Sequence, residues 1–194
     1  MPSSESGNID LIITWVRAYQ PKTLLDIGVG TAKFGLMFRD YLDGHWVGHA
    51  FHDKSTWTMR MVGVEIFKNY LTPVHDYLYD EILTIDIYEY LKSIQKSEKF
   101  DLIFMGDILE HFPKDVGIKL IDLLRDKCLN IGGHIIISTP NVPTRIDDPR
   151  SIIFGNDHEV HRCRWYSSDF DVWPGFVNRV VATRSLTVAM EKVK

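Results

Sequence analysis

The sequence contains little cysteine, no long apolar run and no excess of basic residues. Each of these absences argues against one class of protein. The only cysteines are Cys128 and Cys163, and because neither belongs to a Cys-x-x-Cys pair, a disulfide framework is not indicated. No stretch approaches the roughly 20 apolar residues of a membrane span, and residues 1–7 lack the apolar centre of a signal peptide. We therefore expect a cytoplasmic protein with no membrane partner and a disordered lead-in over residues 1–7.

Acidic residues slightly outnumber basic ones. With 22 Lys and Arg against 26 Asp and Glu, the formal net charge is −4. Proteins that bind the nucleic-acid backbone normally present a basic face, so nucleic acid is not an expected partner. The length of 194 residues fits one domain, which we expect to span residues 8–194.

The order of elements indicates an α/β protein. Short apolar runs predict strands, amphipathic stretches between them predict helices, and two β-rich runs predict a hairpin over residues 176–194. This alternation implies a mostly parallel sheet with helices on both faces. An insertion at residues 43–59 and a long loop at residues 140–168 interrupt it, and we expect both to be lids over a pocket. The strands are expected at residues 23–27, 61–66, 82–85, 100–105 and 134–138.

Capping and breaking residues predict where elements begin and end. Asn8 is the expected N-cap of a helix over residues 9–19. Pro73 is expected to lie inside a helix over residues 68–79 or to divide it. The Gly132-Gly133 pair predicts a turn that leads into the fifth strand.

Four of the expected strands end at or beside an acidic residue. Asp26, Glu65, Asp86 and Asp107 lie at or beside the ends of the first four strands, and the carboxyl ends of parallel strands meet along the edge where such sheets bind ligands. The resulting anionic rim would repel the pyrophosphate of NAD or FAD. The dinucleotide pattern G-x-G-x-x-G also fails, because Lys33 stands at its third glycine, and no P-loop occurs. S-adenosylmethionine, with a sulfonium and an ammonium against one carboxylate, suits such a rim.

The strand ends resemble the motifs of the class I S-adenosylmethionine-dependent methyltransferases. The run LLDIGVGT at residues 24–31 is similar to their first motif, a hydrophobic stretch followed by D-x-G-x-G. The runs DILEH at 107–111 and STPN at 138–141 are similar to the segments after their fourth and fifth strands. The resemblance spans about residues 8–192. It implies a Rossmann-like three-layer sandwich with a mostly parallel seven-stranded sheet of order 3-2-1-4-5-7-6.

The resemblance also implies S-adenosylmethionine as the cofactor and assigns residues to it. Glu65 is implied to hold the ribose hydroxyls and Asp86 to lie near the adenine amino group. The insertion at residues 43–59 makes the interval between Gly30 and Glu65 longer than in the compact family pattern, which could misplace Glu65. The complete set of implied cofactor-binding residues is Asp26, Gly28, Val29, Gly30, Glu65, Asp86, Ile87, Asp107 and Ile108.

Two histidines are the expected catalytic residues. His111 follows the fourth strand and His161 lies in the loop after the fifth, so both should emerge beside the sulfur of the cofactor. Histidine titrates near neutral pH, and either imidazole could accept a hydroxyl proton as the methyl arrives. His158 and Glu159 could orient His161. The alternative is structural, with His111 bonded to a backbone carbonyl and His161 pinning its own loop.

Methyl transfer does not require a metal, and we assign none from the sequence. The run at residues 107–111 resembles the E-x-x-E-H metal ligands of some methyltransferases. The same Leu-Glu-His triplet is common in relatives without a metal, so the sequence leaves open whether Glu110 and His111 bind a divalent ion.

The predicted function is methyl transfer to an oxygen of a small-molecule acceptor, with a homodimer left open. Two alternatives remain. One is a non-catalytic subunit that binds S-adenosylmethionine, which would need to keep neither His111 nor the long loop after the fifth strand. The other is an NAD-type oxidoreductase, which Asp26 and Lys33 disfavour.

Overall fold

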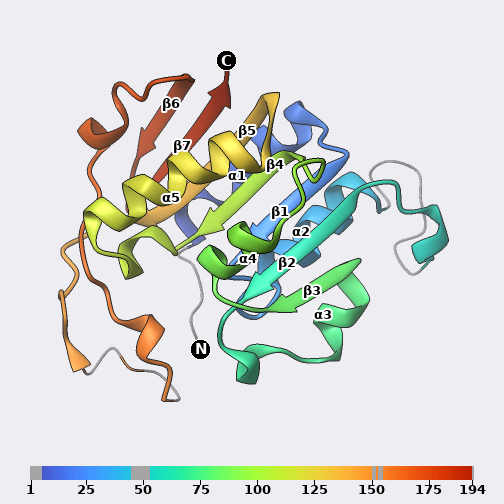
Figure 1. Cartoon of the computed structure of the whole chain (residues 1–194), viewed down its shortest axis with the longest axis horizontal. Helices are drawn as coiled ribbons and strands as arrows, with labels where there is room; N and C mark the ends of the chain where they lie inside the picture. The colour runs from blue at the N-terminus through green and yellow to red at the C-terminus, as the bar shows by residue number, and fades with distance from the viewer. Residues whose placement is uncertain (1–5, 45–52, 150–151, 153–154, 194) are drawn as a thin grey trace.

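The computed structural model describes residues 6–44, 53–149, 152 and 155–193 (Figure 1). Its strands are β1 (Thr23–Ile27), β2 (Arg60–Glu65), β3 (Glu81–Thr84), β4 (Phe100–Gly106), β5 (Leu129–Pro140), β6 (Phe176–Ala182) and β7 (Ser185–Lys192). They form a seven-stranded sheet of order β3-β2-β1-β4-β5-β7-β6. Strands β1 to β5 pair in parallel, while β7 runs antiparallel between β5 and β6. The predicted sheet order is confirmed.

Helices cover both faces of the sheet (Figure 1). The helices are α1 (Ile9–Tyr19), α2 (Lys33–Leu42), α3 (Pro73–Leu78), α4 (Ile87–Ser93) and α5 (Lys114–Lys127). Successive strand residues point to opposite faces, so Leu24 packs in the core under α1 and α2 while Leu25 packs in the core under α4 and α5. The predicted three-layer sandwich is confirmed. None of the described helices has both the length and the apolar character that crossing a membrane requires.

The start of the described chain is held to the terminal hairpin. The 3-10 helix η1 (Ser6–Asn8) leads directly into α1, so the predicted lead-in is wrong for its last two residues, and residues 1–5 lie outside the described chain. Asn8 precedes α1 as expected, but its side chain does not cap the helix. The amide donates instead to the backbone oxygen of Ser185 and to Oγ1 of Thr187, which ties α1 to β7.

One of the two alternatives predicted for Pro73 is confirmed, and one other predicted boundary needs correction. The helix expected over residues 68–79 is divided, because the 3-10 turn η4 (Lys68–Tyr70) ends before Pro73, which begins α3. The Gly132-Gly133 pair does not separate the fifth strand from the preceding chain. Strand β5 already begins at Leu129 and contains both glycines in a stretch of shifted pairing with β4.

A buried ion pair closes the segment at residues 43–59. Arg39 of α2 is fully buried, and its guanidinium donates to the Asp43 carboxylate at 2.7 Å and to the backbone oxygen of Met59 at 2.5 Å. The other carboxylate oxygen of Asp43 accepts from the backbone N–H of Met59 at 3.1 Å. The two ends of the segment are therefore fixed to each other beside the N-terminal end of β2.

We expect Asp43→Ala to lower the free energy of unfolding by about 1–3 kcal/mol, because it leaves buried N–H groups of Arg39 and Met59 without an acceptor. Asp80 still pairs with the guanidinium. Urea denaturation followed by circular dichroism measures the change. Asp40→Ala, at a half-buried position of the same helix, is the matched control and should cost less than about 0.5 kcal/mol. A loss of under about 1 kcal/mol in Asp43→Ala, the average effect of a substitution, would contradict a holding role for the ion pair.

Candidate functional site

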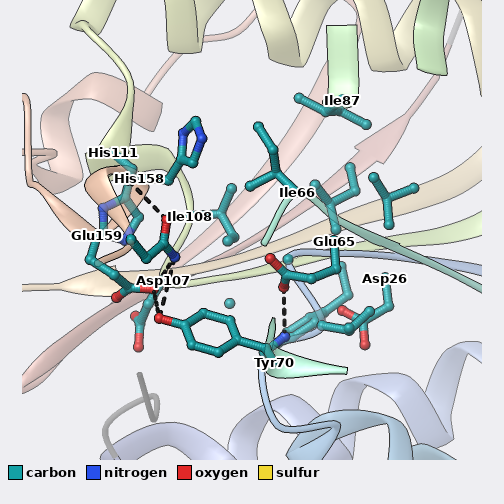
Figure 2. A pocket seen from close by; sticks show the side chains of 18 of the residues that line it. Asp26, Glu65, Ile66, Tyr70, Ile87, Asp107, Ile108, His111, His158 and Glu159 are labelled. Atoms are coloured by element: carbon teal, nitrogen blue, oxygen red, sulfur yellow. Dashed lines mark hydrogen bonds between the residues drawn. The ribbon is translucent and has the colours of Figure 1, made fainter. Parts of the chain in front are cut away.

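A cavity of about 320 Å³ lies at the C-terminal ends of β1, β2 and β4, the edge at which parallel sheets bind ligands. All of the site residues predicted from the sequence line it, although they come from segments far apart in the chain (Figure 2). They are Asp26, Gly28, Val29, Gly30, Glu65, Asp86, Ile87, Asp107, Ile108, His111 and His161. Their assignment to a cofactor or an acceptor stays a prediction.

The two segments expected to be lids differ in their position. The loop at residues 140–168 lines the cavity through Asn156 and His158, among others. By contrast, no described residue of the segment at 43–59 lines it, since that segment leads into the N-terminal end of β2. The expectation of a lid is therefore wrong for the described part of 43–59, and residues 45–52 lie outside the described chain.

Glycine shapes the turn after β1. Gly28 has a φ of 75°, in the left-handed region that favours glycine, and a Cβ there would lie 2.0 Å from Cδ1 of Ile108. Its N–H donates to the oxygen of Val64 at 2.8 Å, which ties the turn to β2. On the other side, Nε2 of the buried His75 lies 3.0 Å from the oxygen of Gly30. The backbone of the turn is thereby held against the cavity.

Asp26, one residue before the end of β1, has a buried side chain and is not displayed on an open rim. Its carboxyl accepts a hydrogen bond from the Tyr79 hydroxyl at 2.5 Å. Burial raises the pKa of Asp26 to about 7, although the Tyr79 hydrogen bond acts in the opposite direction. A nearby positive charge favours the ionised form of a carboxyl, so this position suits a cationic ligand better than an anionic one.

Glu65 bridges the ends of β1 and β2. Its Oε2 accepts from the N–H of Gly30 at 3.0 Å, and its Oε1 accepts from the N–H of Phe67 at 2.9 Å. These bonds place Glu65 beside the first turn, so the long interval before β2 does not displace it. Burial raises the pKa of Glu65, and the two backbone hydrogen bonds oppose that shift. Each carboxylate oxygen keeps lone-pair capacity for a further donor.

The other two strand-end acids are half-buried. The carboxylate of Asp86 accepts from the N–H of Tyr88 at 2.8 Å and caps α4, which is a common structural role for such an acid. Asp107 follows β4 with a φ of 55°. The anionic rim predicted from the sequence is thus divided between two buried carboxyls and two partly exposed ones.

Isoleucines provide the apolar walls between these acids. Ile66, Ile87 and Ile108 line the cavity, and Figure 2 shows their side chains around it. Ile66 remains 37% exposed despite its size, so it offers apolar surface to a bound ring. With Glu65 and Asp86 available for polar edges, these residues fit an adenosine-type ligand.

Two histidines face each other at the opposite end of the cavity. The ring centroids of His111 and His161 are 5.0 Å apart, with an angle of 73° between the planes. Nδ1 of His111 lies 3.4 Å from the oxygen of Val160, the carbonyl contact that the structural alternative expects, yet the ring still lines the cavity. Burial lowers the pKa of both imidazoles, and that of His161 falls to about 4. The lowered pKa values favour the uncharged form of each ring.

Glu110 anchors the loop that follows β5. Its backbone oxygen accepts from the N–H groups of Arg162 and Cys163 at 2.7 and 3.2 Å. Its Oε2 accepts from the Thr139 hydroxyl at 3.0 Å. The side chain is only 2% exposed, and this burial raises the pKa of Glu110 well above its usual value.

A hydrogen-bonded contact joins the two sides of the cavity. The Tyr70 hydroxyl donates to Oε1 of Glu159 at 2.9 Å, and the Asn156 amide donates to both groups at 3.2 Å (Figure 2). The sequence singled out Glu159 only as a residue that could orient His161, whereas its carboxylate accepts from Tyr70 and Asn156. Tyr70 had no sequence signal, because its partner is 89 positions away.

The solved structures that match the chain share its fold. No family model matches it, and no curated protein matches its sequence significantly. The O-methyltransferase from Bacillus cereus in complex with SAH is 16% identical, with a TM-score of 0.63 over 98% of this chain and 84% of that one. A SAM-dependent methyltransferase from Archaeoglobus fulgidus is 15% identical, with a TM-score of 0.60 over 94% of both chains. The SAH-bound Podospora anserina methyltransferase PaMTH1 is 14% identical, with a TM-score of 0.59 over 94% and 76%. At these identities the likeness shows that the chain has the fold of SAM-dependent methyltransferases.

We expect Asp26→Asn to flatten the pH dependence of stability in the ligand-free protein. The pKa of Asp26 rises from an ordinary 3.8 to about 7 on folding. The folded state therefore holds the proton more tightly, and its stability falls as pH rises through this window. Asparagine keeps an acceptor for Tyr79 but does not ionise. The free energy of unfolding in urea is measured for both proteins at pH values across this window. The difference between wild type and Asp26→Asn should shift against the wild type as the pH rises. The exposed Asp10→Asn is the control, and equal slopes for Asp26→Asn and wild type would contradict the assignment.

Proposed function

We propose that the chain is an S-adenosylmethionine-dependent methyltransferase that acts on an oxygen of a small-molecule acceptor. The observation that carries the proposal is that a glycine turn, buried carboxyls, apolar walls and two histidines all line one cavity. The fold that the chain shares with SAH-bound methyltransferases supports the choice of cofactor.

The two ends of the cavity suggest how the cofactor is held. Glu65 would accept hydrogen bonds from the ribose hydroxyls, since both of its oxygens retain lone-pair capacity beside the first turn. Ile66 and Ile87 would pack against the adenine ring, with Asp86 near its amino group. Asp26 and Asp107 would stand near the positively charged end, where the ammonium and sulfonium favour their ionised forms.

The protein's contribution to catalysis would be alignment. When bound, the cofactor supplies a methyl group activated by a positively charged sulfur. Holding an acceptor in line with that carbon can lower the barrier by about 7–11 kcal/mol. His111 and His161 would handle the acceptor group, because an uncharged imidazole can accept a hydrogen bond from a hydroxyl and take its proton as the methyl arrives.

We expect SAH to bind the protein in isothermal titration calorimetry, and NAD and ATP not to, because their phosphates would meet the carboxyls around the first turn. Glu65→Gln should weaken SAH binding at least about 10-fold, since a hydrogen bond to a charged group contributes about 1.5–3 kcal/mol. Glu191→Gln is the matched control, because Glu191 of β7 lies opposite His134 of β5 and does not line the cavity. Tighter binding of NAD than of SAH would favour the oxidoreductase alternative.

We expect His111→Ala and His161→Ala to lower turnover about 10²- to 10⁴-fold with SAH affinity retained, as removal of a proton-accepting group does. The assay follows labelled methyl from the cofactor into a panel of small hydroxyl and carboxyl compounds. His134→Ala, whose ring stacks on Tyr19 outside the cavity, should keep wild-type turnover. Near-wild-type turnover in both test variants would remove the histidines from the reaction. Binding of SAH without transfer to any acceptor would favour the non-catalytic alternative.

A further inference from the structure

We propose that Glu110, His111 and His161 bind one divalent transition-metal ion at the acceptor end of the cavity. The ion would be held by one carboxylate oxygen and two imidazole nitrogens. Its remaining coordination positions would face the cavity and be open to an oxygen of the acceptor. This last point rests on the proposed function, whereas the metal site itself does not. With the ion bound, each imidazole would use its lone pair on the metal, so His111 and His161 would act on the acceptor through the ion and not as proton acceptors.

The three side chains come from two distant segments and converge. Glu110 and His111 belong to the 3-10 turn η5 (Leu109–His111) after β4, and His161 lies in the loop after β5. One ligand atom from each lies within 4.8 Å of the other two. Bonds of about 2.0–2.2 Å to a tetrahedral ion place ligand atoms roughly 3.4 Å apart. Small side-chain rotations would therefore complete the site.

The buried carboxylate of Glu110 gives the strongest support for a cation at this position. The side chain is almost completely buried, and Thr139 donates to its Oε2. Its Oε1 has no hydrogen-bond partner among the described residues. A buried carboxylate oxygen without a partner is costly, and buried charges in proteins are normally paired or bound to metals. Since Glu110 also lines the cavity, an ion there could reach the unpartnered oxygen.

Backbone contacts orient the His111 ring and fix the chain next to His161. The N–H groups of Arg162 and Cys163 donate to the backbone oxygen of Glu110, which holds the chain next to His161 against η5. Nδ1 of His111 lies 3.4 Å from the Val160 oxygen. A proton on Nδ1 leaves the lone pair on Nε2. A backbone carbonyl that fixes the outer ring nitrogen is the usual support of a metal-binding histidine.

The ligand types indicate which ion the site would take. Imidazole suits zinc, cobalt, iron and nickel, whereas magnesium and calcium prefer oxygen ligands. Two histidines with one carboxylate is a set found at zinc sites that keep a position open for water or substrate. A hydroxyl or carboxylate acceptor is the kind of group that could occupy such a position.

Zinc and cobalt binding to the untagged protein tests the proposal without any enzymatic assay. Metal-free protein is prepared with a chelator and titrated with Zn²⁺ or Co²⁺, using calorimetry, elemental analysis after dialysis, and the visible absorption of bound Co²⁺. We expect one ion per chain, with no displacement by excess Mg²⁺. His161→Ala and Glu110→Gln should each weaken binding by more than the about 10- to 100-fold that loss of a supporting residue costs. His134→Ala should leave the affinity unchanged.

The outcomes separate this proposal from the proposed function. Absence of stoichiometric Zn²⁺ and Co²⁺ binding by the wild type would overturn the metal site, as would unchanged affinity in His161→Ala. If Glu110→Gln does not fold, as judged by circular dichroism, His161→Ala decides the matter, because its side chain is only half-buried. SAH binding is measured on the same samples. Protein that binds SAH but no metal loses only this inference, and protein that binds metal but no SAH loses only the proposed function.

Discussion

The parallel pairing of β1 between β2 and β4 is the constraint on which the rest of the structure depends. It brings the carboxyl ends of three strands to one edge, so the turn after each strand lines the same cavity. In this register Asp26 lies beside Gly63 and Phe104. A slip of one residue would reverse the face to which every side chain of β1 points. The glycine turn and the Glu65 bridge both require that register, because they join residues that follow β1 to the end of β2.

Several buried carboxyl groups line the cavity, and the surrounding side chains do not fully compensate the cost of ionising them. Burial raises the pKa of Asp26, of Glu65 and of Glu110, which means that the folded protein disfavours their charged forms. A bound cation would offset this cost, since a nearby positive charge favours ionisation. The proposed cofactor would do so at the ends of β1 and β2, and the proposed metal ion at the end of β4. The two proposals thus address the same electrostatic problem at opposite ends of one cavity.

Local signals account for the parts of the site that were predictable. An acid directly after a strand of a parallel sheet must lie at the carboxyl edge of that sheet, wherever the strand is placed, so Asp86 and Asp107 could be located without coordinates. The position of the loop at residues 140–168 beside the cavity follows from the same rule, because that loop leaves the carboxyl end of β5. The segment at 43–59 enters the amino end of β2, and its described residues accordingly lie away from the cavity. Tyr70 and His75 carried no local signal, because their partners lie far along the chain.

The sequence by itself determined the fold class and the identity of the residues at the strand ends, because periodicity, turn residues and motif spacing are local properties. The order of the strands came only from the resemblance to the class I methyltransferases. Only the tertiary structure decided the hydrogen-bond partners, the protonation and the relative placement of those side chains. It paired Asp26 with Tyr79, 53 positions away, and it brought His161 to Glu110 and His111. Protonation and ligand geometry depend on burial and on distances between side chains from separate segments. Those quantities come into existence only when the chain packs.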